Sequence, residues 1–237
     1  MAKSIDSYAE RAKAGLPLIE VSGRYPTQSR DERNIVRDVV AKLELGPDDT
    51  LLEIGCGPGT LLIPLAFECA DATGIDNPAS LDLLASRFTG PPEITTIAGD
   101  FMSVSIDTQY DTILVYNVLH ALPTADDAFR FARRATDLLV PGGRLLLGDL
   151  ANRDKRARFH TSPAGIEFQR DWTERQAGTS LTTIGANDEI VGAFDDATIA
   201  HLLLELRAAG FESYLLPQPS DLPFGRTRDD ILVRRPR

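Results

Sequence analysis

The sequence has few of the residues that mark several protein classes. Its 237 residues include only two cysteines, Cys56 and Cys69, which excludes a disulfide scaffold and fits a reducing compartment. It has no apolar run of about 18 residues, so no membrane span is expected. Charged residues stand where a secretory signal would have its apolar stretch, between Met1 and Glu10. We therefore expect a cytoplasmic protein with no membrane partner.

Basic residues are also scarce relative to acidic ones. There are 25 Lys and Arg residues against 35 Asp and Glu residues, which gives a formal net charge of −10. A negative chain repels phosphate backbones, so the charge disfavours a nucleic acid partner. With 43% hydrophobic and 25% charged residues, the composition is otherwise that of an ordinary globular protein.

Short apolar runs alternate with helical stretches through the middle of the chain. This alternation favours an α/β fold with a mostly parallel sheet covered on both faces. We predict a Rossmann-like, seven-stranded sheet with helices on both faces and an antiparallel C-terminal edge strand. The predicted strands include residues 50–54, 72–75, 94–98, 112–116 and 144–147, and the predicted helices include 59–67, 78–87 and 125–139.

The two ends of the chain extend this pattern. Ser29 and Glu32 have the spacing of a capping box, which predicts a helix from about residue 30 to residue 45. A helix near 196–209 and strands near 211–216 and 231–233 would close the sheet as an antiparallel pair. We predict one domain, with an N-terminal helical segment (1–48), a cofactor-binding core (49–150), a polar insertion or lid on the substrate side (151–195) and a closing segment (196–237).

The most informative segment follows the first predicted strand. Gly55, Gly57 and Gly59 stand at alternate positions in a turn that leads into a helix. Without a Cβ atom, glycine lets a ligand approach the end of a strand, where open α/β sheets bind their ligands. The alternative is a glycine turn that serves only as a tight connection.

Three further turns carry polar or aromatic residues at the same expected edge. Asp76 ends the second strand, 21 residues after Gly55, near the spacing at which an acid meets ribose hydroxyls, although it could instead cap a helix. Asp100 and Phe101 follow the third strand and could bind an exocyclic amine and stack on a purine. Asn117 follows the fourth strand, so one ligand could touch all four turns.

Taken together, these motifs resemble the class I S-adenosylmethionine-dependent methyltransferases, over about residues 51–150 and the closing strands. The segment Asn-Val-Leu-His-Ala-Leu-Pro at 117–123 resembles the small-molecule, UbiE-like branch. The resemblance implies S-adenosylmethionine as methyl donor and S-adenosylhomocysteine as product. It implies contacts from Glu53, Gly55, Cys56, Gly57 and Gly59 to the methionine part, from Asp76 and Asn77 to the ribose, from Asp100 and Phe101 to the adenine, and from Asn117 and Val118 beside the methyl donor.

The resemblance also implies a small-molecule acceptor, with a hydroxyl oxygen favoured and transfer by in-line displacement. His120 is the best-placed general base, because the reference pKa of histidine is about 6.5, although it could simply pack beneath the cofactor. His160, in the insertion, is a second candidate. The expected substrate-binding residues are Tyr25, Arg153, Arg156 and Trp172.

Three alternatives remain from the sequence. A dehydrogenase fingerprint needs a third glycine where this chain has Thr60. A protein or RNA methyltransferase of the same fold would need a basic patch, which Arg226, Arg228 and the arginines near the C-terminus could supply. A regulatory protein could bind the cofactor without catalysis. No metal is expected, and a homodimer is left open.

Overall fold

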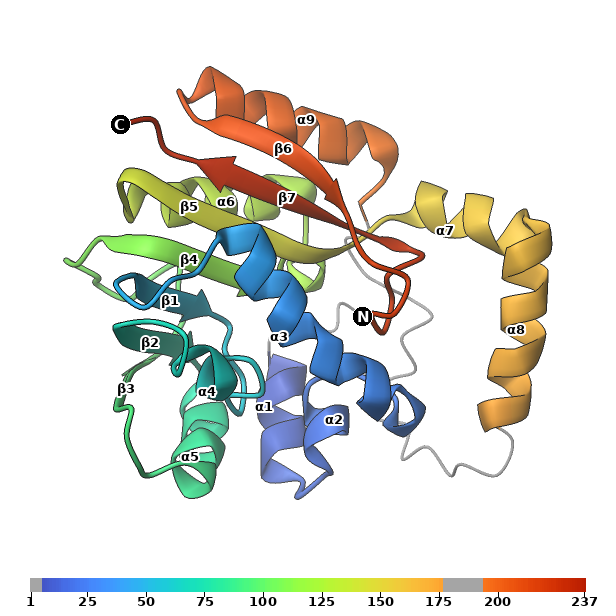
Figure 1. Ribbon diagram of the computed structural model, residues 1–237, viewed down its shortest axis with the longest axis horizontal. Coiled ribbons are helices and arrows are strands. Elements are labelled where there is room, and N and C mark those ends of the chain that lie inside the picture. The colour runs from blue at the N-terminus through green and yellow to red at the C-terminus, as the bar shows by residue number, and fades with distance from the viewer. Residues whose placement is uncertain (1–5, 177–193) are drawn as a thin grey trace.

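The computed structural model describes residues 6–176 and 194–237, and in these residues seven strands form one sheet (Figure 1). The strand order is β3-β2-β1-β4-β5-β7-β6, and the first five strands are parallel. The strands are β1 (Thr50–Ile54), β2 (Asp71–Asp76), β3 (Ile94–Ala98), β4 (Tyr110–Tyr116), β5 (Leu139–Ala151), β6 (Glu212–Pro217) and β7 (Arg228–Arg234). β7 lies antiparallel between β5 and β6, so β6 forms the edge. The predicted Rossmann-like fold is confirmed.

Helices cover both faces of the sheet because apolar residues alternate along the central strands. Leu114 of β4 faces one core, with α3 (Ser29–Leu43), α4 (Leu62–Leu65) and α5 (Pro78–Arg87). Its neighbour Ile113 faces the other core. That second core holds α6 (Ala125–Asp137) and α9 (Asp196–Ala208). Alternate residues of a strand point to opposite faces, so one sequence period builds both layers.

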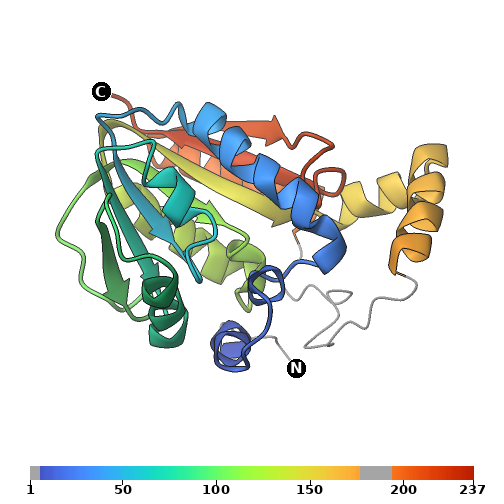
Figure 2. The same ribbon diagram turned by 60° about the horizontal axis from the view of Figure 1, so that its bottom comes forward.

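Short elements surround this sheet. At the N-terminal end lie α1 (Asp6–Lys13), α2 (Leu18–Val21) and the 3₁₀ turn η1 (Pro26–Gln28); a second 3₁₀ turn, η2 (Leu119–Ala121), follows β4. Two helices occupy the predicted insertion, α7 (Arg153–Thr161) and α8 (Pro163–Gln176). Figures 1 and 2 both show them extending away from the sheet, and the rest of the predicted lid, 177–193, lies outside the described residues. No helix in the described part of the chain has the length and apolar character needed to cross a bilayer.

The structure corrects two local predictions. β5 is much longer than residues 144–147, because Leu139 already pairs with Tyr110 and the register then shifts to the pair Thr112 and Arg144. The Pro-Gly-Gly segment at 141–143 is therefore an irregularity within the strand.

The second correction concerns the start of α3. The predicted capping box of Ser29 and Glu32 is wrong, because η1 runs directly into α3 and leaves Ser29 already helical. The capping box forms one turn earlier, where the Tyr25 backbone N–H donates to Gln28 Oε1 at 3.0 Å. Glu32 is thereby free to accept a hydrogen bond from Arg24 at 3.2 Å.

Candidate active site

A cavity of about 310 Å³ opens at the carboxyl ends of the central parallel strands. It brings together ten of the eleven residues expected to bind a cofactor: Glu53, Gly55, Cys56, Gly57, Asp76, Asn77, Asp100, Phe101, Asn117 and Val118. The exception is Gly59, where a Cβ atom would lie 2.9 Å from Leu84 Cδ1, so this glycine allows close packing on α5. The four predicted turns therefore line one cavity.

The glycine turn is shaped for close approach. Gly55 has a φ of 80°, and a Cβ atom there would lie only 2.5 Å from Val118 Cγ2. Gly57 also has a positive φ, of 54°, and its N–H donates to Asp76 Oδ2 at 2.7 Å. Because a side chain at Gly55 would be both strained and blocked, this backbone stays open to the cavity.

Asp76 joins two of the turns. Its Oδ1 accepts hydrogen bonds from the backbone N–H and the side-chain Nδ2 of Asn77, at 2.7 and 2.6 Å. Burial raises the pKa of this carboxyl, and the hydrogen bonds from Gly57 and Asn77 oppose that rise. Asn77 caps α5 by accepting from the Ser80 N–H at 3.0 Å, so the cap that Asp76 could have formed belongs to its neighbour.

Two buried side chains of opposite charge, Glu53 and Arg24, line another part of the cavity. Glu53 is 3% exposed, and its Oε2 has no hydrogen-bond partner among the residues described. Burial is the main reason that the pKa of Glu53 lies well above its ordinary value; Asp76 adds to the rise and Arg24 opposes it. Arg24 is buried, lines the cavity and lies 5.9 Å from the ring centre of Tyr116.

Arg24 is a candidate binding residue that sequence reasoning missed. It lies in the N-terminal segment, 29 residues before Glu53, and no strand end or glycine spacing relates the two. Its pairing with Glu32 and its approach to the cavity follow only from the packing of the N-terminal segment on the sheet.

Asn117 holds that segment in place. It has a φ of 62°, in the left-handed region, and its Nδ2 donates to the backbone oxygen of Ser22 at 3.2 Å. The hydroxyls of Ser22 and Thr60 lie 3.0 Å apart, which ties the same segment to the glycine turn. The N-terminal segment thus forms a wall of the cavity.

The opposite part of the cavity is aromatic. Phe101 is buried and lies 4.6 Å from Phe131, ring centre to ring centre. The guanidinium carbon of Arg134 lies 5.1 Å from the same ring, and Asp100 Oδ1 accepts from the Met102 N–H at 3.1 Å. A carboxylate and a fixed ring therefore stand together, as the adenine prediction requires.

The two candidate bases lie in different surroundings. His120 is buried on η2; burial is the main cause that lowers its pKa to about 3, and nearby Arg228 lowers it further. Its ring bonds to the backbone of Asp149, while Nδ1 has no partner among the described residues. His160 lies on α7 beside Phe159, and burial also lowers its pKa. Neither histidine lines the cavity.

The four predicted substrate residues divide into two groups. Tyr25 and Trp172 meet edge to face with ring centres 5.3 Å apart, and Phe168 stacks on Trp172 at 6.1 Å. Arg153 is largely exposed and pairs with Asp195 at 2.5 Å, and Arg156 lies on the same helix, α7. The structure therefore brings Tyr25 and Trp172 together, whereas Arg153 and Arg156 lie apart from them on α7.

Residues 51–143 match the family described as "Methyltransferase domain". Residues 51–143 are therefore similar to methyltransferase domains, and they include the strand ends that line the cavity. No set of three or more His, Cys, Asp or Glu side chains in the described ranges is placed to hold a metal ion.

Individual relatives show how far the likeness extends. Ubiquinone biosynthesis O-methyltransferase from Azorhizobium caulinodans is 29% identical over 165 residues, covering 68% of this chain and 58% of that protein. Ribosomal RNA small subunit methyltransferase A from Chlorobium phaeobacteroides is 36% identical over 76 residues, covering 32% and 27%. The chain thus spans less than two thirds of the length of these curated relatives.

Among solved structures, the N-methyltransferase NodS from Bradyrhizobium japonicum, in complex with S-adenosylhomocysteine, superposes with a TM-score of 0.62. The alignment covers 98% of this chain and 99% of NodS at 21% identity. At that identity the likeness establishes the fold.

Proposed function

We propose that the chain transfers a methyl group from S-adenosylmethionine to a small molecule. The observation that carries this proposal is the single cavity that Gly57, Asp76, Asp100 and Asn117 line at the carboxyl edge of the sheet. The residues present fit a sulfonium nucleoside, because Glu53 offers a buried carboxylate oxygen without a partner and Gly55 leaves room that a Cβ atom would fill. The match of residues 51–143 to the methyltransferase domain supports it.

The chain's own residues would divide the binding as follows. Glu53 would accept hydrogen bonds from the amino group of the methionine part, and Arg24 would pair with its carboxylate. Asp76 would accept from the ribose hydroxyls, and Asp100 and Phe101 would hold the adenine. This division leaves the exit of β4, at Asn117 and Val118, for the methyl group.

When bound, S-adenosylmethionine supplies a methyl group already activated by the positive sulfur. The protein therefore acts mainly by holding the acceptor in line, since orientation alone is worth effective molarities of about 10⁵ to 10⁸ M. We place the acceptor against Tyr25 and Trp172, with Arg153 and Arg156 further away on α7. A hydroxyl oxygen remains the favoured acceptor, although the named relatives include both an O-methyltransferase and an N-methyltransferase.

His120 is the residue we propose for the acceptor's proton, with His160 as the second candidate. Its lowered pKa keeps the imidazole neutral at pH 7, and Nδ1 can then accept a hydrogen bond from an acceptor hydroxyl. As the oxygen bonds to the methyl carbon and the carbon–sulfur bond breaks, the hydroxyl proton would pass to Nδ1. A ring with so low a pKa would not keep that proton at pH 7.

A protein or RNA target of the same fold is the second candidate, and the similarity to a ribosomal RNA methyltransferase favours it. The basic patch that it needs is weakened in the structure. Arg228 is buried, and Arg234 pairs with Glu44 at 2.6 Å. A cytoplasmic location and a homodimer stay predictions.

Methyl transfer can be measured directly with S-adenosylmethionine that carries a labelled methyl group. The purified chain, incubated with separate panels of phenols, alcohols and amines and with bulk RNA, should form S-adenosylhomocysteine only with a small-molecule panel, and the label should appear in an ether. Label in RNA would overturn the small-molecule assignment. Cofactor binding without turnover on any panel would favour the regulatory alternative.

A further inference from the structure

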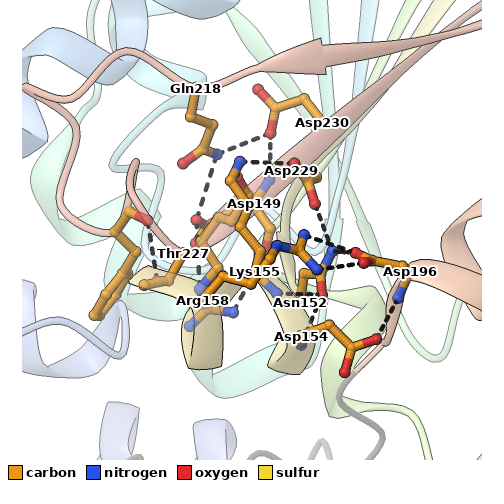
Figure 3. Close-up of polar contacts among 12 residues, drawn as sticks. Asp149, Asn152, Asp154, Lys155, Arg158, Asp196, Gln218, Thr227, Asp229 and Asp230 are labelled. Atoms are coloured by element: carbon orange, nitrogen blue, oxygen red, sulfur yellow. Dashed lines mark hydrogen bonds and ion pairs between the residues drawn. The ribbon is translucent and has the colours of Figure 1, made fainter. Parts of the chain in front are cut away.

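A cluster of buried charges lies where β5 ends and β7 begins, one strand away from the cavity, and Figure 3 shows part of it. Lys42 Nζ lies 2.6 Å from the carboxylates of both Asp38 and Asp230. Lys155 Nζ lies 2.7 Å from Asp229 Oδ1. Each of these three carboxylates therefore has a lysine at short range.

Asp149, at the centre of Figure 3, has no such partner. It is 3% exposed; its Oδ1 lies 3.5 Å from Gln218 Nε2 and 4.0 Å from Arg228 Nε. Its Oδ2 has no hydrogen-bond partner among the residues that the structure describes. Asp230, by contrast, accepts short bonds from Lys42, from Gln218 at 2.8 Å and from the Asp149 N–H at 2.8 Å. Among the ion pairs of these four carboxylates, the one between Asp149 and Arg228 is the longest, at 4.0 Å.

The backbone at Asp149 is also unusual. Its φ is 61°, a left-handed conformation that is uncommon outside glycine. Asn117 on the neighbouring strand has a φ of 62°, and its N–H donates to the oxygen of Gly148 at 3.1 Å. Strained residues cluster at functional sites because the surrounding structure must hold them. The backbone at Asp149 therefore follows directly on the residue that pairs with Asn117, which lines the cofactor cavity.

A second unpartnered atom lies close by. His120 bonds to the Asp149 backbone with one ring nitrogen and leaves Nδ1, a buried acceptor, without a partner in the described residues. Buried polar atoms are costly when they lack a hydrogen bond, and a buried carboxylate is more costly still. Two buried acceptor atoms, on residues that a hydrogen bond joins, therefore lack a donor among the described residues.

We propose that Asp149 is a specificity-determining residue that binds an ammonium group of the acceptor, so that the acceptor is a hydroxyl-bearing amine. This inference rests on the proposed methyltransferase function and names its substrate class. An ammonium would supply both N–H donors and a second positive charge beside that of Arg228, whereas a hydroxyl supplies a donor without charge. His120 Nδ1 then receives the hydroxyl that is methylated.

The first test needs no ligand and compares Asp149→Asn with Asp230→Asn by thermal unfolding. Asparagine tolerates a left-handed φ and removes a charge that lacks a good partner, so Asp149→Asn should raise the melting temperature by about 2 to 4 °C. Asp230→Asn breaks an ion pair with Lys42 and should lower it by at least about 5 °C. A fall for Asp149→Asn as large as that for Asp230→Asn would show a structural carboxylate and overturn the proposal.

The second test uses tyramine and 4-ethylphenol, which share a phenol and differ in the ammonium group. With S-adenosylhomocysteine saturating, the wild type should bind tyramine at least about tenfold more tightly, and Asp149→Asn should abolish that preference. Equal affinities in the wild type, no binding of tyramine, or a preference that survives the substitution would each overturn the assignment. If S-adenosylhomocysteine itself does not bind, the proposed function fails; if it binds and the preference is absent, only this inference fails.

Discussion

Replacing Asp76 with alanine should weaken the binding of S-adenosylhomocysteine by roughly 1 to 3 kcal/mol, or about 5- to 150-fold. The ribose hydroxyls would lose their acceptor inside a buried site. The Gly57 N–H would lose its partner at 2.7 Å, so the glycine turn would also lose a restraint on its shape. Both effects act on the same ligand, and calorimetric titration measures their sum.

The matched control is Asp71→Ala at the start of the same strand, where the side chain is exposed. It should leave the affinity unchanged. Because Asp76 holds the nucleoside, its substitution should weaken 5′-methylthioadenosine, which lacks the amino acid part, as much as S-adenosylhomocysteine. Wild-type affinity in the Asp76 variant would show that the ribose lies elsewhere.

Replacing Arg24 with leucine should weaken the binding of S-adenosylhomocysteine but not that of 5′-methylthioadenosine. The guanidinium lies in the cavity beside Glu53, where we place the carboxylate of the methionine part. Removing one partner of a buried charge pair costs about 2 kcal/mol or more, so S-adenosylhomocysteine should bind at least roughly 30-fold more weakly. The affinity for 5′-methylthioadenosine, which carries no carboxylate, should stay within about twofold of the wild type.

Arg37→Leu serves as the control for Arg24, because Arg37 is exposed and pairs with Asp221 at 3.0 Å. It should leave both affinities unchanged. An equal loss for both ligands in the Arg24 variant would indicate that the N-terminal segment has come away from the cavity, and no loss for either would refute the carboxylate assignment.

The four turns could be predicted from the sequence because each depends on local order. Glycines directly after a strand, and acids at the ends of the next two, must meet when the strands are parallel and adjacent in one sheet. Gly57, Asp76 and Asp100 therefore needed no knowledge of distant contacts. The strands could also be predicted from local runs of apolar residues. The exception is the first part of β5, where the register shifts between Tyr110 and Thr112 and no regular alternation marks the strand.

The walls of the site could not be predicted in this way. Arg24 and Ser22 reach the cavity only because the N-terminal segment packs over β4, through the bond from Asn117. The surroundings of Asp149 also depend on distant residues. Gln218 and Asp230 contact it only because β7 returns antiparallel to β5. No spacing in the sequence encodes such contacts.

Calorimetric titration of the purified chain with S-adenosylhomocysteine tests most directly whether the four turns form one nucleoside site. We predict one site per chain with micromolar affinity, and a melting temperature that rises with ligand concentration because the ligand binds only the folded state. No heat and no shift in melting temperature at millimolar ligand would contradict this account.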